Sequence, residues 1–151
     1  MYKRILVGFD GSQSAETACS HAFSLAKFSG AHVTVLWVRD SLPHFPESID
    51  EIAVEEESAL EFFRSLEMRI RRLHEPEDGM VDVRRANGRP AEKIVAVANA
   101  GDYDLIVLGN RGHHGFFGRL LGCTADKVSD HSSCDVLIVK GPGNPVHGII
   151  K

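Results

Sequence analysis

One stretch decides the fold of this chain: Leu105-Ile106-Val107-Leu108 followed directly by Gly109-Asn110-Arg111-Gly112-His113-His114-Gly115-Phe116-Phe117-Gly118-Arg119-Leu120-Leu121-Gly122-Cys123-Thr124. The four apolar residues predict a buried strand, and Ala125-Asp126-Lys127-Val128 is typical of the first turns of a helix. A glycine-rich loop between a strand and a helix N-terminus favours an anion site, because glycine lets the backbone approach phosphate oxygens and the helix offers unpaired N–H groups. Arg111 and Arg119 add positive charge. The alternative is an ordinary flexible loop, since single glycines often mark turns.

Composition narrows the class of protein. The chain has 151 residues, an apolar fraction of 43% and a net charge of −4, which is typical of one globular domain. A nucleic-acid or anionic-membrane binder is more often basic, so neither partner is expected. No apolar run approaches the length of a membrane span, and the N-terminus has no signal-peptide pattern. Three widely spaced cysteines form neither a disulfide framework nor a zinc site, so a cytoplasmic location is expected.

Outward from the quoted stretch, apolar runs alternate with helical patterns along the whole chain. The runs predict five strands, and four segments with helical periodicity lie between them. Strands are expected over residues 3–10, 33–38, 80–84, 105–108 and 136–139, and helices over 13–29, 49–74, from 90 onward and over 123–131, with a loop over 39–48. This alternation predicts a single doubly wound α/β domain, with a five-stranded parallel sheet and helices on both faces.

Two strand ends supply further candidate binding residues. The first strand ends at Gly8-Phe9-Asp10, and ligands of parallel sheets bind beside the carboxyl ends of the strands. Gly8 and Asp10 are therefore candidate contacts, although Asp10 or Ser12 could instead cap the following helix. The second strand ends at Trp37-Val38 on the same edge. Trp37 could stack on a base, or it could be a core or interface residue.

The glycine spacing resembles a known family. Gly109 and Gly112, followed after nine residues by Gly122, resemble the ATP-binding loop of the universal stress protein family. A Gly-x-Pro at Gly88 and Pro90 also resembles this family, and the resemblance extends over residues 1–140, with 141–151 as a C-terminal tail. The family usually has Ser or Thr after the last glycine, where this chain has Cys123. This departure removes the hydroxyl group but leaves the backbone N–H groups.

The resemblance implies a set of site residues and a strand order. Gly109, Gly112 and Gly122 would shape the loop, and the N–H groups of Cys123 and Thr124 would hold phosphate. Asp10 would contact the ribose or a bound Mg²⁺, and Val38 would line the adenine pocket. Arg111 adds charge. The implied strand order is 3-2-1-4-5, which would bring the loops after Asp10 and Gly109 side by side.

The strand over residues 136–139 would lie at an edge of this sheet. It is wholly apolar, Val136-Leu137-Ile138-Val139, with no lysine or proline to prevent pairing with another chain. The pattern predicts a homodimer through Val136–Val139, and the resemblance implies the same dimer.

Three functions remain open at this point. The first is an ATP-binding or other adenine-nucleotide-binding homodimer in stress response or signalling, with an unknown protein partner. The second is a dimeric adaptor that binds no nucleotide, and the third is a slow Mg²⁺-dependent ATP hydrolase. Binding is favoured over catalysis, because the common hydrolase, metalloprotease and phosphate-loop motifs are missing and no catalytic residue can be assigned. Cys123, close to a helix start and to Arg119, is either a redox-sensitive thiol or a small residue in place of serine.

Overall fold

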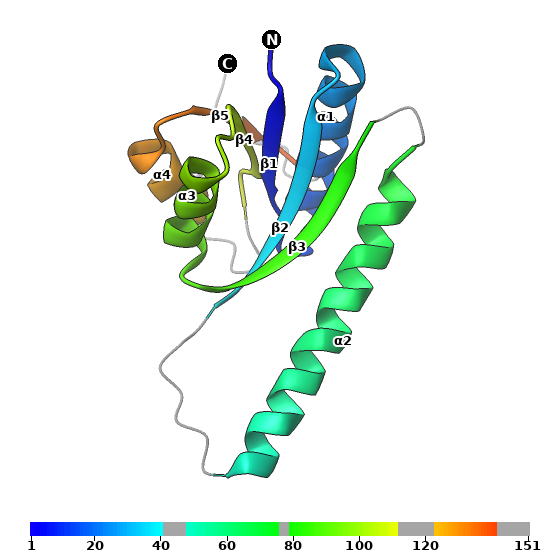
Figure 1. Cartoon of the computed structure of the whole chain (residues 1–151), viewed down its shortest axis with the longest axis vertical. Coiled ribbons are helices and arrows are strands. Elements are labelled where there is room, and N and C mark those ends of the chain that lie inside the picture. Colours follow the sequence, from blue (N-terminus) through cyan, green and yellow to red (C-terminus); the bar gives the residue numbers. More distant parts are fainter. Residues whose placement is uncertain (41–47, 76–78, 112–122, 142–151) are drawn as a thin grey trace, which may run out of the picture.

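The computed structural model describes residues 1–40, 48–75, 79–111 and 123–141. Its elements are, in chain order, β1 (Arg4–Gly8), α1 (Gln13–Ser29), β2 (His32–Asp40), α2 (Ile49–Leu73), β3 (Val81–Gly88), α3 (Pro90–Ala100), β4 (Leu105–Gly109), α4 (Cys123–His131) and β5 (Asp135–Val139). Figure 1 shows a twisted sheet with α1 and α2 on one face and α3 and α4 on the other. The expected doubly wound α/β fold is thus confirmed.

The sheet is parallel throughout, with the order β3-β2-β1-β4-β5. β1 lies at its centre, with Ile5 opposite Val33 of β2 and Leu105 of β4. The chain therefore winds outward from β1 in both directions. The carboxyl ends of β1 and β4 are neighbours, as the strand order requires.

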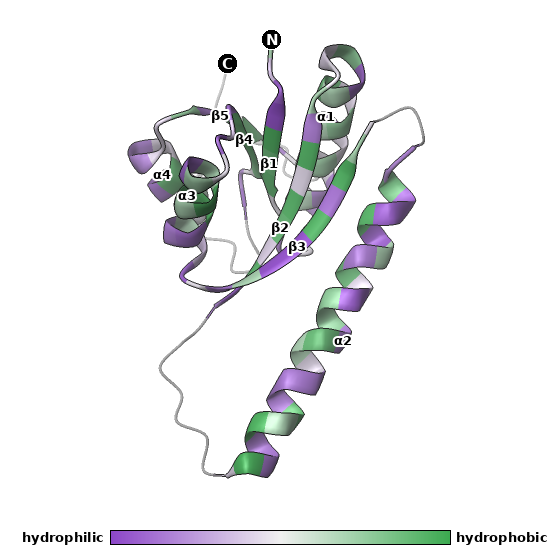
Figure 2. Ribbon diagram, viewed as in Figure 1, coloured by the Kyte–Doolittle hydropathy of each residue, from purple (hydrophilic) through white to green (hydrophobic). Residues whose placement is uncertain are grey.

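The central strands are apolar in continuous runs because helices cover both faces. Ile5 and Val7 pack with α1 and α2, while Leu6 between them packs with α3 and α4. All three are fully buried. In Figure 2 the central strands are mostly hydrophobic, whereas α2 mixes hydrophilic and hydrophobic residues along its length. This contrast is expected, because one face of α2 is exposed to solvent whereas both faces of the central strands are covered by helices.

The helix boundaries follow from local chemistry. The side chain of Ser12 accepts a hydrogen bond from the Ala15 N–H at 3.2 Å and caps α1, which ends at Gly30 in the left-handed conformation, with φ of 72°. The Ser48 hydroxyl caps α2 in the same way, through the Glu51 N–H at 3.1 Å. Pro90 occupies the first turn of α3, as expected.

Two strands are longer than expected. The loop predicted over residues 39–48 is wrong at its start, because Arg39 and Asp40 continue β2. They do so because β3 continues to Gly88 and pairs with them, with Asp40 opposite Gly88. The extension carries Asp40 to the carboxyl edge of the sheet. Among the helices of the described segments, none has the length and apolar character needed to cross a membrane.

The two edges of the sheet differ. β3 alternates half-buried and exposed residues and carries Asp82, Arg84 and Arg85, as expected of a guarded edge strand. β5 is shorter and apolar apart from Asp135, and the side chain of Leu137 is 37% exposed. β5 is thus the less protected edge.

Candidate functional site

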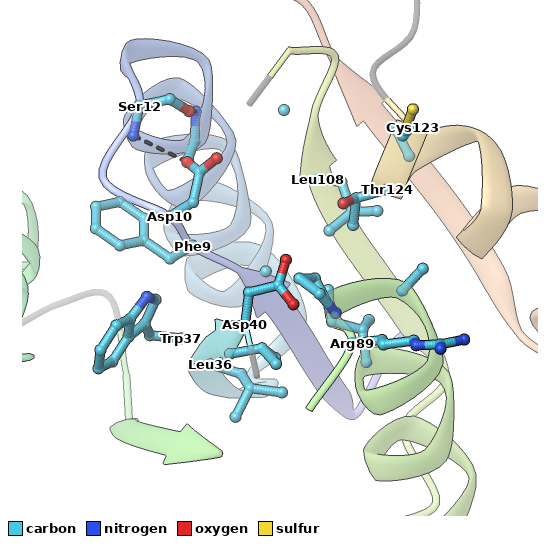
Figure 3. A pocket seen from close by; sticks show the side chains of 18 of the residues that line it. Phe9, Asp10, Ser12, Leu36, Trp37, Asp40, Arg89, Leu108, Cys123 and Thr124 are labelled. Atoms are coloured by element: carbon cyan, nitrogen blue, oxygen red, sulfur yellow. Dashed lines mark hydrogen bonds between the residues drawn. The ribbon is translucent and has the colours of Figure 1, made fainter. Parts of the chain in front are cut away.

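A pocket of about 670 Å³ opens at the carboxyl ends of β1, β2 and β4. Its walls come from these three strand ends, from the first turns of α3 and α4, and from Phe62 of α2 (Figure 3). The pocket lies where the winding of the sheet reverses, which is the usual ligand position in open α/β sheets. Its volume falls within the range of about 300–1,000 Å³ typical of small-molecule sites.

One part of the pocket is apolar. Leu36, Trp37 and Val38 line it from β2, and the start of α3 adds Pro90, Ala91 and Ile94. Trp37 is held in place by α2, with its ring centroid 5.1 Å from Phe62 and 6.1 Å from Phe63. Trp37 therefore does two things that the sequence left as alternatives, because it packs against a helix and also lines the pocket.

The end of β1 forms a second wall. Gly8 is required for close packing, since a Cβ atom there would come within 2.5 Å of Leu108 Cδ2 and 3.0 Å of Ile94 Cδ1. Asp10 lines the pocket, and its Oδ1 accepts a hydrogen bond from the Ser12 N–H at 2.9 Å. Ser12, not Asp10, accepts the capping bond of α1. Of the two roles weighed for Asp10, the position in the pocket is the one compatible with a ligand contact.

The end of β4 is fastened to the start of α1. The Ser14 hydroxyl donates to the backbone oxygen of Arg111 and accepts from its N–H at 3.3 Å, and the Ser12 hydroxyl donates to the same oxygen at 3.3 Å. Gly109 lies so close to α1 that a Cβ atom would stand 2.6 Å from the Ser14 backbone carbon and 2.8 Å from Ala15 N. The described start of the glycine-rich loop is therefore rigidly placed beside Asp10.

α4 brings Cys123 and Thr124 to the pocket from its first turn. Cys123 is exposed and Thr124 half-buried. The other two cysteines differ from it. Cys19 is buried in the core, and this burial raises the pKa of its thiol to about 12, while Cys134 is half-buried beside Ser132. Gly112 and Gly122, and the loop between them, lie outside the described residues.

Four charged pocket residues were not predicted from the sequence. These are Asp40 at the end of β2, Arg89 and Glu92 at the start of α3, and Lys127 in α4. Asp40 could have been found by the reasoning applied to Asp10, had β2 been drawn two residues longer. Lys127 follows Cys123 by one helical turn, so the helix prediction already placed it on the same side. Arg89 directly precedes the Pro90 that the sequence had marked as a helix start.

The expected metal ligand Asp10 remains a prediction. Across the described segments, no group of three or more His, Cys, Asp or Glu side chains could hold a metal ion. A cation at this pocket would therefore need further ligands, such as phosphate oxygens and water, which is the usual environment of Mg²⁺ in nucleotide sites.

The fold and the pocket define a doubly wound α/β domain with a small-molecule cleft at its switch point. Residues 1–140 match the model of the universal stress protein family, and the chain belongs to that family. It is 34% identical to universal stress protein YxiE of Bacillus subtilis, over 93% of this chain and 100% of that protein.

Solved structures agree with this assignment. The universal stress protein UspA from Lactobacillus plantarum matches with a TM-score of 0.81 and 26% identity, covering 91% of this chain and 97% of that one. A universal stress protein solved in complex with cAMP matches with a TM-score of 0.66 and 27% identity, over 91% and 97% of the two chains. One from Archaeoglobus fulgidus in complex with dAMP matches with a TM-score of 0.60 and 25% identity, over 92% and 98%.

Proposed function

We propose that this protein is a cytoplasmic homodimer that binds an adenine nucleotide, ATP in particular, and acts in stress response or signalling. One observation carries the binding proposal: a single pocket combines an apolar slot, a helix N-terminus and the end of a glycine-rich strand–loop junction. The cAMP and dAMP complexes of two family members support an adenine ligand.

The pocket residues suit the parts of a nucleotide. The slot formed by Leu36, Val38 and Ala91 has the apolar walls that a purine ring needs, and Trp37 lines the pocket from the opposite face of β2. Asp10 lines the pocket near the end of β4, where its carboxylate can accept hydrogen bonds from ribose hydroxyl groups. The N–H groups at the start of α4, from Cys123 and Thr124, are suitable for a phosphate. Gly109, Gly112 and Gly122 would shape the loop, Arg111 would add charge, and Mg²⁺ would neutralise the phosphates.

Calorimetry with ATP and AMP tests the binding proposal. The parent protein is expected to bind with micromolar affinity, and Asp10→Asn to bind about tenfold more weakly, because the neutral amide is a poorer acceptor for hydroxyl groups. Asp126→Asn on α4 is the matched control, since Asp126 is exposed and does not line the pocket. Gly122→Val tests the loop, and it should abolish binding by blocking close approach of the phosphate.

The same titrations separate the two alternative functions. Absence of heat with either nucleotide, from a folded protein, would favour the adaptor that binds no nucleotide, with Cys123 as its mark. Turnover of ATP that scales with Mg²⁺ and is lost in Asp10→Ala would favour the slow hydrolase.

The homodimer proposal rests on the β5 edge. Leu137 is 37% exposed, and among the described residues β5 pairs with a strand on one side only, which favours pairing with a second copy. Sedimentation should show a dimer at micromolar concentration for the parent, and a monomer for Leu137→Lys. A parent that stays monomeric across that range would contradict the proposal.

A further inference from the structure

Positive and negative side chains are unevenly distributed around the pocket. Arg89 at the start of α3 and Lys127 in α4 line the pocket from the two helices on one face of the sheet, whereas Asp10 and Arg111 lie together beyond the ends of β1 and β4. The start of α4 adds backbone N–H groups on the side of the two helices. That side thus carries more positive groups than one phosphate would need.

Lys127 is placed to act on a ligand. It follows Cys123 by four residues, and both side chains line the pocket. Side chains on a helix lean toward its N-terminus, so the lysine extends toward the Cys123 turn. Its side chain is exposed, and it makes no ion pair with any residue in the described ranges.

Arg89 occupies a position that helix stability disfavours. It is the N-cap residue of α3, where Ser, Thr, Asp or Asn is preferred, and its side chain makes no capping hydrogen bond. A positive charge there also meets the positive end of the helix dipole. Its acidic neighbour Glu92 lies 3.5 Å away, and both side chains are more than 70% exposed. Departures from local preference of this kind often mark functional positions.

The two cations approach the same part of the pocket from different helices. α3 and α4 pack against each other, and Figure 3 shows Arg89 reaching along the side on which Cys123 and Thr124 lie. A phosphate at the start of α4 would therefore have the ammonium and guanidinium groups outside it. These groups would meet further phosphates of a longer chain.

We propose that Arg89 and Lys127 recognise the second and third phosphates of the nucleotide, so that the site prefers a nucleoside triphosphate to a monophosphate or a cyclic monophosphate. This inference rests on the proposed nucleotide binding at the same pocket. The first phosphate is held by backbone groups and is common to all these ligands. Discrimination by phosphate number must therefore come from side chains farther out, and these two are in place.

Calorimetry without added Mg²⁺, using AMP, cAMP, ADP and ATP, tests the inference. The parent is expected to bind ATP about ten to one hundred times more tightly than AMP, with ADP between them, because the added phosphates accept charge-assisted hydrogen bonds whose strength is limited by solvent screening. Lys127→Gln and Arg89→Gln should each weaken ATP binding about three- to tenfold. AMP binding should change less than twofold.

Two further variants sharpen the result. Lys93→Gln on α3 removes one positive charge away from the pocket lining and is the matched control, with all four affinities expected within twofold of the parent. Glu92→Gln removes the carboxylate that competes with phosphate for Arg89. The affinity for ATP should therefore rise at least about twofold, and the affinity for AMP should not change. Because Arg89, Glu92 and Lys127 are exposed and Lys93 is half-buried, each variant should keep the far-UV spectrum of the parent.

The outcomes distinguish this inference from the function on which it rests. Equal affinities for AMP and ATP in the parent would overturn the proposed preference for the triphosphate and leave the proposal of nucleotide binding intact. Equal losses for both nucleotides in Lys127→Gln would overturn it as well, since the lysine would then act on the first phosphate. Failure of all four nucleotides to bind would overturn both proposals.

Discussion

The two ends of the sheet use polar side chains differently. At the amino end, Asp104 accepts hydrogen bonds from the N–H groups of Lys3 at 2.8 Å and Arg4 at 3.1 Å. At the carboxyl end, Asp40 points into the pocket and makes no hydrogen bond or ion pair through its side chain with the described part of the chain (Figure 3). The Asp104 carboxylate thus stabilises the fold, whereas we expect the Asp40 carboxylate to contact a ligand.

Other residues extend this contrast. Tyr2 donates to Asp135 at 2.8 Å, and this hydrogen bond raises the pKa of the phenol, because ionisation would remove the bond and place two negative charges together. The hydroxyl of Tyr103 donates to Thr34 at 2.7 Å in the interior near the same end. Polar groups at the amino end therefore contribute to stability. Under the proposed function, Asp10 and Asp40 at the pocket contribute to binding, as is typical of sites built on a rigid scaffold.

Gly109 is the residue at which the division between stabilising residues and binding residues should fail most clearly. It belongs to the site, yet Gly109→Ala is expected to cost about 3 kcal/mol or more of unfolding free energy, because the new Cβ would overlap the backbone of Ser14 and Ala15. The measurement is urea unfolding of the parent and the variant. Loss of less than 1 kcal/mol would mean that α1 and β4 can move apart easily.

Gly30 is the matched control for Gly109. A Cβ atom at Gly30 meets nothing within 4 Å, but the φ of 72° is unfavourable for alanine. Gly30→Ala should therefore cost only about 1–2 kcal/mol. Nucleotide affinity should be unchanged in this variant, because Gly30 lies at the far end of α1 from the pocket.

Cys19 and Cys123 sharpen the contrast between interior and site. Because burial raises the pKa of Cys19 from 9.0 to about 12, its contribution to stability is fully present below pH 9 and is lost as the pH rises toward 12. From pH 8 to pH 10 the loss is about 1 kcal/mol, because pH 10 lies one unit above the unfolded pKa. The free energy of unfolding of the parent should fall by that much relative to Cys19→Ala.

Alkylation of the folded protein gives the second readout for the thiols. Cys123 is exposed at the pocket and should react first, while Cys19 should react only on unfolding. Bound ATP should slow the alkylation of Cys123, because its phosphates are proposed to lie beside this thiol at the start of α4. Equal rates for Cys19 and Cys123 in the folded state would contradict the assignment of the buried thiol.

Most of the fold could be predicted because its signals are local. The apolar runs, the Ser12 cap, Gly30 and Pro90 each determine an element or its end from a few neighbouring residues. The extra length of β2 could not be predicted in this way. Arg39 and Asp40 carry no strand signal of their own and are held in the sheet by pairing with Asn87 and Gly88 of β3.

The site was only partly predictable for the same reason. Asp10, Val38, Gly109 and the start of α4 follow from strand ends and from the glycine spacing, and the structure brings their described residues to one pocket. Ser14 was missed because its role is to hold Arg111, 97 residues away in sequence. Arg89 and Lys127 were missed because charged residues on helices are usually solvated, and only the packing of α3 against α4 brings both residues to one pocket.

The smallest expected effects test the contrast between the two ends directly, through the same substitution at Asp104 and at Asp40. Asp104→Asn should cost about 1 kcal/mol of stability, because the amide can accept at most one of the two N–H groups well, and ATP affinity should stay within twofold. Asp40→Asn should change stability by less than about 0.5 kcal/mol, as for a surface substitution, and should change ATP affinity by about threefold or more. Urea unfolding gives the unfolding free energy of each variant, and calorimetry gives the ATP affinity of each. If Asp40→Asn unfolds the protein more easily than Asp104→Asn does, the carboxyl end is also part of the stabilising framework, and the division between the two ends is wrong.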